Sequence, residues 1–401
     1  MKKKKDILFL CQFFHPEYIS SAQLPFDTVR ALKKAGFSVD VLCGYPREYS
    51  ASENVPVTEE IDGIRIRRLK YIQLDRSGFL GRLVNYFSFT FMVLLNLFRT
   101  ASYRAVVVYS NPPILPWIAS WAKVLFGTKL IFVAYDLYPE VATVTNTLRQ
   151  GNMICRLMDH INKVVFRRCD SVVALSSEMK DYIAAHRDIS ADKVTVIPNW
   201  YKDGGELRCR EENRFREIVK GRFVVSYFGN MGTMQDMQTI LGAIRQLRNE
   251  DVFFLFAGHG NKMEDLKRIT AEEQIPNIAI YDFLHGEDFQ DALAVSDCAF
   301  VSLEKGATGL CVPSKTYSYM MQGIPLLAIM DEGDIVRDIE AGAGKWVRNG
   351  DSDGLAKAIL DMKADPQAHA AMRKVSRQLY LNKYTTEICT DQYVSLFRSL
   401  L

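Results

Sequence analysis

The chain has 401 residues, whereas domains with one hydrophobic core rarely exceed roughly 250 to 300 residues, so we expect two domains of similar size. Hydrophobic residues make up 48% and charged residues 24% of the chain, which argues against a disordered, collagen-like or coiled-coil protein. The net charge of +3 is unevenly spread, because residues 1–200 carry 26 Lys and Arg against 18 Asp and Glu. We therefore expect an anionic partner at the first half.

The first residues combine four lysines with an apolar run, as a secretory signal peptide would. Asp6 opens this run, and no small-residue cleavage site follows it. We therefore interpret residues 6–14 as the first buried strand of an α/β domain. The eight cysteines include no C-x-x-C pair and no spacing typical of a zinc or iron–sulfur site, so we expect reduced thiols in a cytoplasmic chain.

The first half repeats a strand–helix–strand pattern three times. We expect the first helix from Pro25 to Ala35, the second to end at Gly127, and the third to begin near Ser177. Repeated β-α-β units indicate a parallel sheet covered by helices on both faces. The expected strands are residues 6–14, 38–42, 105–109, 129–134, 171–175 and 193–197.

Residues 63–104 combine positive charge with apolar side chains. Eight basic residues, with Arg65, Arg67 and Arg68 among them, face a single acidic residue. The apolar run 83–98 has 16 residues and a membrane span needs roughly 20, so we expect this segment to lie on an anionic membrane rather than cross it. The alternative is a buried helix flanked by solvated arginines.

A polar, glycine-containing stretch after Tyr201 marks the best domain boundary. We expect an N-terminal domain over residues 1–200, a C-terminal domain over residues 201–380, and a final helix, residues 381–401, that packs back on the first domain. Two Rossmann-like domains would then face each other across a cleft, with ligands beyond the carboxyl ends of the strands. The expected strands of the second domain are residues 223–228, 252–257, 278–281, 297–302, 326–329 and 345–348.

Two glycine-containing loops follow consecutive strands of the second domain. The first is Gly229-Asn230-Met231-Gly232, before a helix expected near Gln235, and the second is Ala257-Gly258-His259-Gly260. Glycines let backbone N–H groups approach a phosphate at a helix N-terminus, which favours a nucleotide site. The alternative for either loop is a tight turn without a ligand.

A lysine is expected in the first turn of a later helix. Ser314 is placed as the N-cap of this helix and Gly323 as its end, so Lys315 projects where cations are intrinsically disfavoured. A bound anion would explain the lysine. The alternative is a solvated lysine on a capped helix.

Together, these segments resemble the retaining glycosyltransferases of family four, which have the GT-B fold, and most closely their bacterial polysaccharide and O-antigen branch with its N-acetylfucosamine-type transferases. In the second half the two glycine loops, residues 283–286 (FLHG) and residues 313–325 (PSKTYSYMMQGIP) carry the resemblance. In the first half it rests on residues 135–140 (YDLYPE), the loop 110–113 and the basic apolar segment.

The resemblance implies that the second domain binds a nucleotide sugar, with UDP-sugar as a substrate and no cofactor or metal. A glutamate pair common in the family is replaced by Leu310 and Ser318. Glu304, in the loop before Gly306, could take the place of a glutamate of this pair if the loop folds back toward the donor. A common Arg and Lys are replaced by Asn230 and Gln235, which leaves Lys315 as the main cation for the diphosphate. The donor-binding candidates are Gly229, Asn230, Gly232, Gln235, Gly258, Gly260, Phe283, Leu284, Glu304, Ser314 and Lys315.

The acceptor side of the cleft is expected from the first domain. Asp136 and Glu140 would orient the acceptor hydroxyl while Lys315 stabilises the leaving diphosphate, and front-face retention needs no protein nucleophile. The alternative is that Asp136 caps a turn and Glu140 forms a structural ion pair. The other acceptor-side candidates are His15, Asn111, and Ser20 and Ser21, which stand where the family often has Gly-Gly.

Two motif-like strings carry less weight. Asp351-Ser352-Asp353 imitates a metal-binding D-x-D, but it opens a helix and is interpreted as a cap. Ser302 and Lys305 imitate S-x-x-K without its companion motifs, and the six histidines have no metal-site spacing.

The sequence therefore predicts a cytoplasmic, peripheral membrane glycosyltransferase that moves a sugar from a UDP-sugar to a lipid-linked saccharide in capsule, O-antigen or exopolysaccharide synthesis. We expect no nucleic-acid partner. The alternatives are a non-catalytic GT-B partner subunit and a nucleotide-sugar epimerase.

Overall fold

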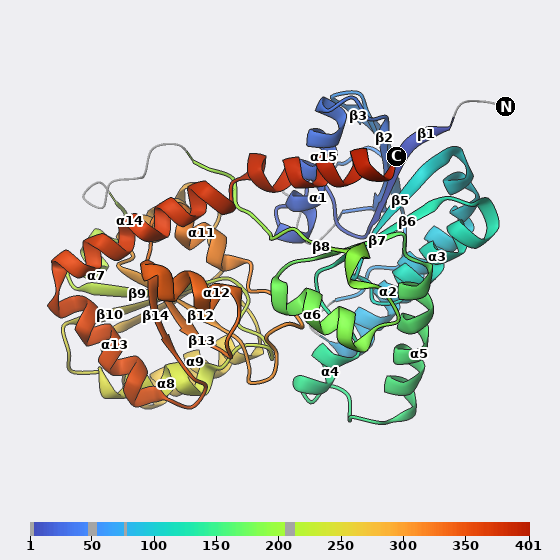
Figure 1. Cartoon of the computed structure of the whole chain (residues 1–401). Helices are drawn as coiled ribbons and strands as arrows, with labels where there is room; N and C mark the ends of the chain where they lie inside the picture. Colours follow the sequence, from blue (N-terminus) through green and yellow to red (C-terminus); the bar gives the residue numbers. More distant parts are fainter. Residues whose placement is uncertain (1–3, 47–53, 76–77, 205–212) are drawn as a thin grey trace.

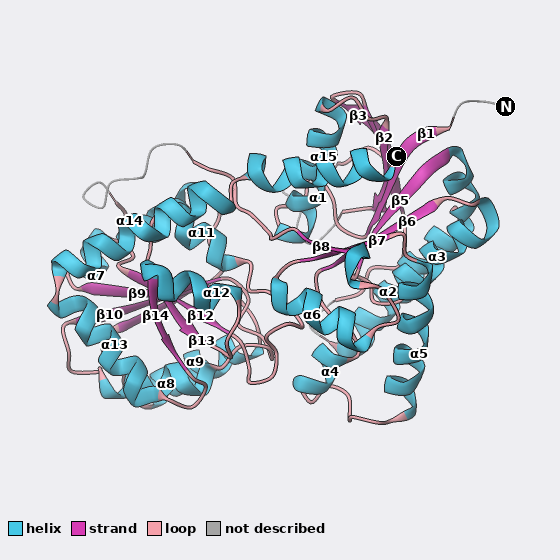
Figure 2. Cartoon of the chain, viewed as in Figure 1, coloured by secondary structure: helices cyan, strands magenta, loops and turns pink. Residues whose placement is uncertain are grey.

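In the computed structural model, which describes residues 4–46, 54–75, 78–204 and 213–401, the chain forms two α/β domains (Figure 1). Each domain is a sheet of mainly parallel strands with helices on both faces (Figure 2). Each sheet has its own hydrophobic core, and one cluster of buried residues lies on each face of the sheet. The expectation of two Rossmann-like domains is confirmed.

The N-terminal sheet has the order β3-β4-β2-β1-β5-β6-β7-β8, and every described pair is parallel except β3 with β4. Its strands are β1 Lys5–Cys11, β2 Val39–Gly44, β3 Thr58–Ile61, β4 Ile64–Leu69, β5 Tyr103–Tyr109, β6 Lys129–Ala134, β7 Ser171–Ala174 and β8 Val194–Val196. Its helices are α1 Ser20–Lys34, α2 Phe79–Leu95, α3 Leu115–Phe126, α4 Glu140–Val144, α5 Met153–Arg168 and α6 Ser177–His186, with short turns η1 Leu97–Ser102 and η2 Ala191–Lys193.

The C-terminal sheet has the order β11-β10-β9-β12-β13-β14 and its described pairs are all parallel. Its strands are β9 Phe223–Phe228, β10 Val252–Ala257, β11 Ile278–Tyr281, β12 Cys298–Ser302, β13 Leu326–Ile329 and β14 Gly344–Val347. Its helices are α7 Arg216–Val219, α8 Met237–Gln246, α9 Asn261–Glu272, α10 Gly286–Val295, α11 Lys315–Met321, α12 Asp334–Asp338, η3 Ile339–Ala343, α13 Ser352–Ala364 and α14 Pro366–Lys383.

Short-range sequence signals set most element boundaries. The central strand β1 is an apolar run from Ile7 to Cys11, and all five residues are buried, as strands covered on both faces require. Gly127 ends α3 in the left-handed region with φ +66°, where a side chain would be strained. Asp351 caps α13 by accepting a hydrogen bond from Gly354 N, so its interpretation as a cap rather than a metal ligand is confirmed.

The structure corrects two expectations in the first domain. Helix α1 begins at Ser20 and contains Pro25 rather than starting there. Strands β3 and β4 were not expected, and they form a hairpin around Asp62 and Gly63, both with positive φ. An Asp-Gly pair is the usual sequence of such a two-residue turn, so the hairpin could have been predicted from the sequence. The arginines that follow the turn were interpreted only as positive charge.

The last helix returns to the first domain. Figure 1 shows α15 (Thr386–Leu400) leaving the end of α14 and lying beside α1. Phe397 of α15 contacts Phe37 with ring centroids 6.3 Å apart, and Tyr393 contacts Trp200 at 6.1 Å. The chain therefore crosses between the domains twice.

Two further links join the domains at the carboxyl ends of their strands. Leu137 N donates to Leu310 O over 2.9 Å, which places residues after β6 against residues after β12. The N-termini of α6 and α12 cap each other, since Ser177 N donates to Asp334 Oδ2 (2.6 Å) and Asp334 N donates to Glu178 Oε2 (3.1 Å). The structure is thus a closed arrangement of the two domains.

Among the described residues, no helix combines the length and the apolar character needed to cross a bilayer.

Candidate active site in the interdomain cleft

The loops after β5 and β6 form the N-terminal wall of the cleft. Ser110 Oγ accepts hydrogen bonds from Tyr135 N (3.1 Å) and Asp136 N (3.0 Å), so one hydroxyl holds the turn that follows β6. Asp136 in turn forms an isolated antiparallel bridge with Cys311 of the other domain. Its backbone is therefore fixed from both sides of the cleft.

The side chain of Asp136 has the protonation behaviour of a proton acceptor. Burial raises its pKa to about 6. Among the described residues no cation forms an ion pair with it, in contrast to the usual buried carboxylate. A carboxylate with a pKa just below neutrality can both orient a hydroxyl and take its proton.

Glu140, the second predicted acceptor-side carboxylate, has another role. Both of its carboxylate oxygens accept from Nη2 of the buried Arg187, each over 2.7 Å. Removing one partner of such a pair leaves a buried charge, so the pair holds α4 against α6. This ion pair supports the structural alternative that the sequence left open for Glu140.

The two glycine loops of the second domain pack on each other. A Cβ at Gly258 would lie 1.9 Å from Gly229 O, and a Cβ at Gly260 would lie 2.5 Å from Met231 O. Both positions therefore require glycine because of contact between the loops. This reason is independent of any ligand.

The backbone N–H groups of the first loop are largely occupied. Gly229 N donates to Ala257 O and Met231 N to His259 O, each over 2.8 Å. Gly232 N donates to Gln235 Oε1, also over 2.8 Å. The N–H groups of Gly229 and Gly232, which were expected to face a phosphate, are therefore bonded within the protein. That Asn230 and Gln235 bind the donor stays a prediction.

Lys315 is the cation of this site. Its Nζ lies 4.7 Å from the centroid of the Tyr227 ring, and its Cε would lie 3.5 Å from a Cβ at Gly229. Burial lowers the pKa of Lys315 to about 8. Within the described parts of the chain no carboxylate lies within ion-pair distance of it. A partly buried ammonium without a counter-charge is the arrangement that an anionic ligand would stabilise.

Cys311 connects the cation with the carboxylate. The charges of both Asp136 and Lys315 act on this thiol, whose pKa is raised mainly by burial. Asp136 and Lys315 therefore both lie near Cys311, Asp136 from the N-terminal domain and Lys315 from the C-terminal domain.

Ser314 and Gly323 bound the seven-residue helix α11. Ser314 occupies the N-cap position, as expected, but it is in helical conformation and its side chain makes no cap hydrogen bond. Gly323 has φ +67° and follows the helix as expected. Ser318 donates to Lys315 O over 2.8 Å, and its side chain therefore supports the helix instead of facing a sugar.

Glu304 folds back toward the donor loops. Its Oε1 forms an ion pair with Lys262 Nζ, which also donates to Thr233 O (3.2 Å) and to Gln235 O. Lys262 thus connects the loop after β9 with the loop after β12. Glu304 therefore lies beside the loop after β9, and its contact with the donor stays a prediction.

An aromatic group closes the cleft at the β11 end. Tyr18, in the loop before α1, contacts His285 with ring centroids 4.5 Å apart and Phe283 at 6.2 Å. His259 lies 5.7 Å from Phe283, whose side chain is 38% exposed, and Leu284 is half-buried beside them. Tyr18, His259 and His285 were not among the predicted site residues, although Tyr18 follows the His-Pro-Glu turn and the two histidines belong to quoted motifs.

The remaining acceptor-side candidates lie at loops that meet the cleft or its rim. His15 stacks on Phe26 with centroids 4.5 Å apart, and burial lowers its pKa. Ser20 and Ser21 are the first residues of α1, and Asn111 follows Ser110 in the loop after β5. The fold brings these residues to the same sheet edge as Asp136, as parallel strands require.

No group of three His, Cys, Asp or Glu side chains suited to a metal ion occurs in the described residues. The seven described cysteines are buried and free.

Comparisons with known proteins agree with this architecture. A glycosyl transferase 4-like domain matches residues 26–200, and a glycosyl transferases group 1 domain matches residues 222–365. The chain is 28% identical over 310 residues to the probable glycosyltransferase WbjE of Pseudomonas aeruginosa, covering 74% of this chain and 76% of that protein.

Two solved structures share the fold over their whole length. Sucrose-phosphate synthase from Thermosynechococcus elongatus superimposes with a TM-score of 0.77 at 15% identity, covering 99% of both chains. Anabaena HepE in complex with UDP-glucose superimposes with a TM-score of 0.73 at 16% identity, covering 99% of this chain and 100% of that chain.

Proposed function

The chain belongs to the GT-B glycosyltransferases, and from this premise we propose that it transfers a sugar from a UDP-sugar to a lipid-linked saccharide. In this proposal the transfer retains the anomeric configuration and takes place at the cytoplasmic face of a membrane. The product would enter a bacterial surface polysaccharide of the capsule, O-antigen or exopolysaccharide type. The donor class is supported by the UDP-glucose complex of HepE. The polysaccharide role is supported by the similarity, 20% identity over 179 residues, to the putative colanic acid biosynthesis glycosyl transferase WcaI of Escherichia coli.

The observation that carries the donor proposal is the unpaired, partly buried ammonium of Lys315. Breaking a sugar–diphosphate bond builds negative charge on the departing nucleotide, and a preorganised cation in a water-poor site stabilises that charge. Lys315 supplies it without a metal ion. The aromatic group around Phe283 is suited to the flat base of the nucleotide, since aromatic rings favour stacked contacts.

The acceptor proposal rests on Asp136. Its carboxylate would accept a hydrogen bond from the attacking hydroxyl and receive the proton as the new glycosidic bond forms. Ser110 holds the Asp136 backbone in place through the two hydrogen bonds described above. Glu140 takes no part in this step, because its carboxylate is bound to Arg187.

The membrane proposal needs one correction from the structure. Arg68 is 1% exposed, donates to His15 O (2.7 Å) and Pro56 O (2.8 Å), and pairs with Glu59. It is therefore a structural arginine and cannot face lipid. Arg65 and Arg67 lie on the other side of β4, where they and burial lower the pKa of Arg99. Arg65, Arg67 and Arg99 form the basic cluster that remains available to an anionic surface.

The apolar part of the membrane-facing surface is larger than the sequence indicated. Helix α2 exposes apolar residues along one face, and α3 and α5, which pack side by side next to it, expose others. Such a surface beside a basic cluster favours an interfacial position on anionic lipid. The exposed apolar residues are Leu80, Phe87, Phe91, Leu94, Leu95, Phe98, Val124, Leu125, Met153, Ile154 and Leu157.

A non-catalytic partner subunit is the second candidate, because Leu310 and Ser318 are buried where the family often has glutamates. The matched glycosyltransferase domains argue against the epimerase alternative. A partner subunit would bind a glycan but would release no UDP.

The donor proposal is tested by thermal stabilisation with UDP and a panel of UDP-sugars, since a ligand at 100 times its Kd adds about 2.7 kcal/mol. We expect stabilisation of the wild type, a much smaller effect in Lys315→Met, and a wild-type response in Lys374→Ala, which removes an exposed lysine of α14. UDP release with a lipid-linked acceptor, in the presence of EDTA, then tests transfer. Absence of nucleotide binding at millimolar concentration would contradict the donor proposal and favour the partner-subunit alternative.

A further inference from the structure

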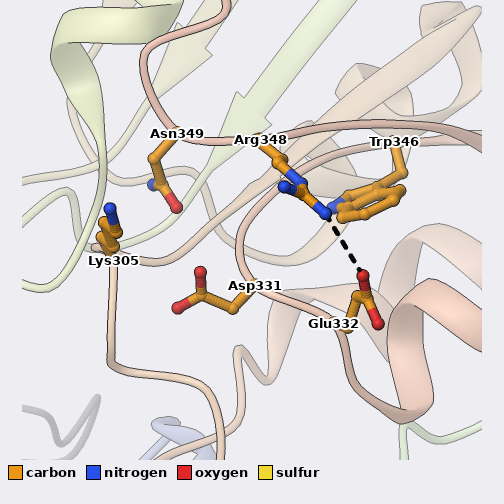
Figure 3. Close-up of a pocket in the computed structure, with 6 residues that line it drawn as sticks. All are labelled: Lys305, Asp331, Glu332, Trp346, Arg348 and Asn349. Atoms are coloured by element: carbon orange, nitrogen blue, oxygen red, sulfur yellow. Dashed lines mark ion pairs between the residues drawn. The ribbon is translucent and has the colours of Figure 1, made fainter.

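A pocket lies at the carboxyl ends of β12, β13 and β14. Its volume is about 390 Å³, within the range of ligand pockets, which is roughly 300 to 1,000 Å³. Figure 3 shows the side chains that surround it, and none of them is among the predicted donor or acceptor residues. They are Lys305, Asp331, Glu332, Trp346, Arg348 and Asn349.

Three of these side chains are held in place by bonds to the domain. Trp346 Nε1 donates to Met330 O over 2.8 Å, which fixes the indole by its edge. Asp331 Oδ2 accepts from Gly306 N over 2.6 Å. Asn349 Nδ2 donates to Asp236 Oδ2 (2.9 Å) and to Leu303 O (2.8 Å). The pocket is therefore built from preorganised groups, with an aromatic ring on one side and an amide and a carboxylate on the other.

Asn349 also carries an unused acceptor. Its Oδ1 is buried and, within the part of the chain that the structure describes, has no hydrogen-bond partner. Figure 3 shows this oxygen on the side of Asn349 that faces the pocket. Buried polar atoms are rarely left unsatisfied, so an O–H or N–H donor of a ligand would complete this site.

The charges of the pocket are balanced. Lys305 and Arg348 face two carboxylates, and Arg348 Nη2 lies 3.5 Å from Glu332 Oε1 across the rim (Figure 3). This rim pair is 78% and 73% exposed, so it contributes little to stability and can separate when a ligand enters. A phosphate would meet two carboxylates here, whereas hydroxyl groups can donate to the acids and accept from the bases.

We propose that this pocket binds an uncharged or amino sugar unit, with a C–H face of the ring on Trp346 and hydroxyl groups on Asp331, Asn349 and Lys305. The slightly positive C–H edge of a sugar suits the negative face of an indole. The Arg348 guanidinium lies over the Trp346 ring, with Cζ 5.9 Å from the centroid, so a sugar on that face takes the place of the guanidinium. The assignment of a saccharide class stands on the pocket alone. That the sugar belongs to the acceptor glycan rests on the proposed function.

The pocket is connected to the active cleft through the loop between β12 and α11, residues 303–314. Asp331 holds this loop at Gly306 and again at Thr308, whose Oγ1 donates to Asp331 O over 3.3 Å. Farther along, Leu310 O accepts from Leu137 N of the N-terminal domain. A glycan bound in the pocket would therefore lie beside the loop that joins the two walls of the cleft.

The test is saturation-transfer NMR on the full chain with methyl glycosides of glucose, galactose and mannose and with N-acetylglucosamine, at millimolar concentration, with and without saturating UDP. We expect saturation transfer to at least one sugar that persists when UDP fills the donor site. Trp346→Ala should weaken this binding about tenfold, the change that one aromatic contact is worth, while UDP binding stays unchanged.

Asp331→Asn is the second variant, because it keeps the size of the side chain and changes only its charge and one acceptor. It should also weaken sugar binding with the melting temperature retained, whereas Lys374→Ala should bind as the wild type does. Sugar signals that UDP abolishes, signals unchanged in both pocket variants, or no signal from any sugar would overturn the proposal. Loss of UDP binding with sugar binding intact would contradict only the proposed function.

Discussion

Lys315→Met removes the charge of the proposed diphosphate stabiliser and keeps a flexible apolar side chain over Tyr227. The wild-type ammonium lies 4.7 Å from the Tyr227 ring centroid and, among the described residues, has no carboxylate partner. In the complex its partner would be the leaving diphosphate. The variant therefore tests one interaction, because no protein ion pair is broken at the same time.

The size of the effect follows from Coulomb's law. Two unit charges 4 Å apart at an effective dielectric constant of 20 attract each other by about 4 kcal/mol. Each 1.4 kcal/mol corresponds to a factor of ten, so the upper bound is roughly a 1,000-fold loss of turnover. Loss of a single preorganised stabiliser typically costs about 100- to 1,000-fold. We therefore expect kcat to fall by two to three orders of magnitude.

The pH profile gives an independent readout of the same site. Asp136 must be ionised and Lys315 protonated, and their pKa values are about 6 and about 8. We expect kcat/KM for the donor to be highest between these values and to fall by about tenfold per pH unit on either side. Lys315→Met should lack the alkaline decline, and Asp136→Asn should lack the acid decline. The assay is the initial rate of UDP release at limiting donor.

Stability separates a catalytic from a structural role for Lys315. Burial lowers its folded-state pKa from 10.5 to about 8, so the charged form is destabilising below pH 8, and this effect disappears as the pH rises toward 10.5. Lys315→Met should therefore have a higher Tm than the wild type at pH 7 while its kcat is lowered by two to three orders of magnitude. Normal turnover, or lost turnover with a lowered Tm, would refute the reasoning. Lys374→Ala controls for loss of a lysine elsewhere.

Four further predictions concern other parts of the structure. Asp136→Asn should slow transfer strongly with UDP binding intact and should raise the Tm at pH 7, because burial disfavours the ionised carboxylate. Loss of both transfer and UDP binding would indicate a structural role. Changing Phe87, Phe91 and Leu94 to Ser should release the protein from anionic liposomes without unfolding it, whereas unfolding of this variant would show that α2 is a core helix. Changing Arg65, Arg67 and Arg99 to Gln should make the remaining liposome binding insensitive to salt. Gly258→Ala should disrupt both glycine loops and UDP binding, because its Cβ would overlap Gly229 O. Gly350→Ala has open space around its Cβ, so it should lower stability only through the backbone strain at its positive φ. Equal UDP binding by both variants would argue against a role for loop packing. Asp334→Ala removes the cap that Asp334 provides to α6, which is worth about 1 kcal/mol, so the equilibrium constant between open and closed domains should shift about fivefold toward the open state. Small-angle X-ray scattering should then give a larger radius of gyration. An unchanged radius of gyration and an unchanged KM would mean that this link does not control closure.

Much of the fold was predictable because it depends on local sequence. Apolar runs of four to six residues marked the strands of the second domain, and β9, β10, β11 and β13 have the bounds that were expected. Asp351 was correctly interpreted as a cap from its place before a helix. The exceptions are also local: β4 was missed because its alternating arginines were weighed as a membrane signal instead of as a strand with one exposed face.

The roles of the charged residues were decided by the tertiary structure. Glu140 and Arg187 are 47 residues apart in the chain, and nothing near Glu140 indicates that an arginine will bind its carboxylate. Arg68 is charged in the sequence but buried in the fold, because Glu59 and two carbonyl groups from separate segments surround it. The sequence by itself determined which residue types reach the sheet edge, since parallel strands all end there. Only long-range packing decided which of them are paired within the protein and which, like Lys315 and Asp136, have no ion-pair partner among the described residues.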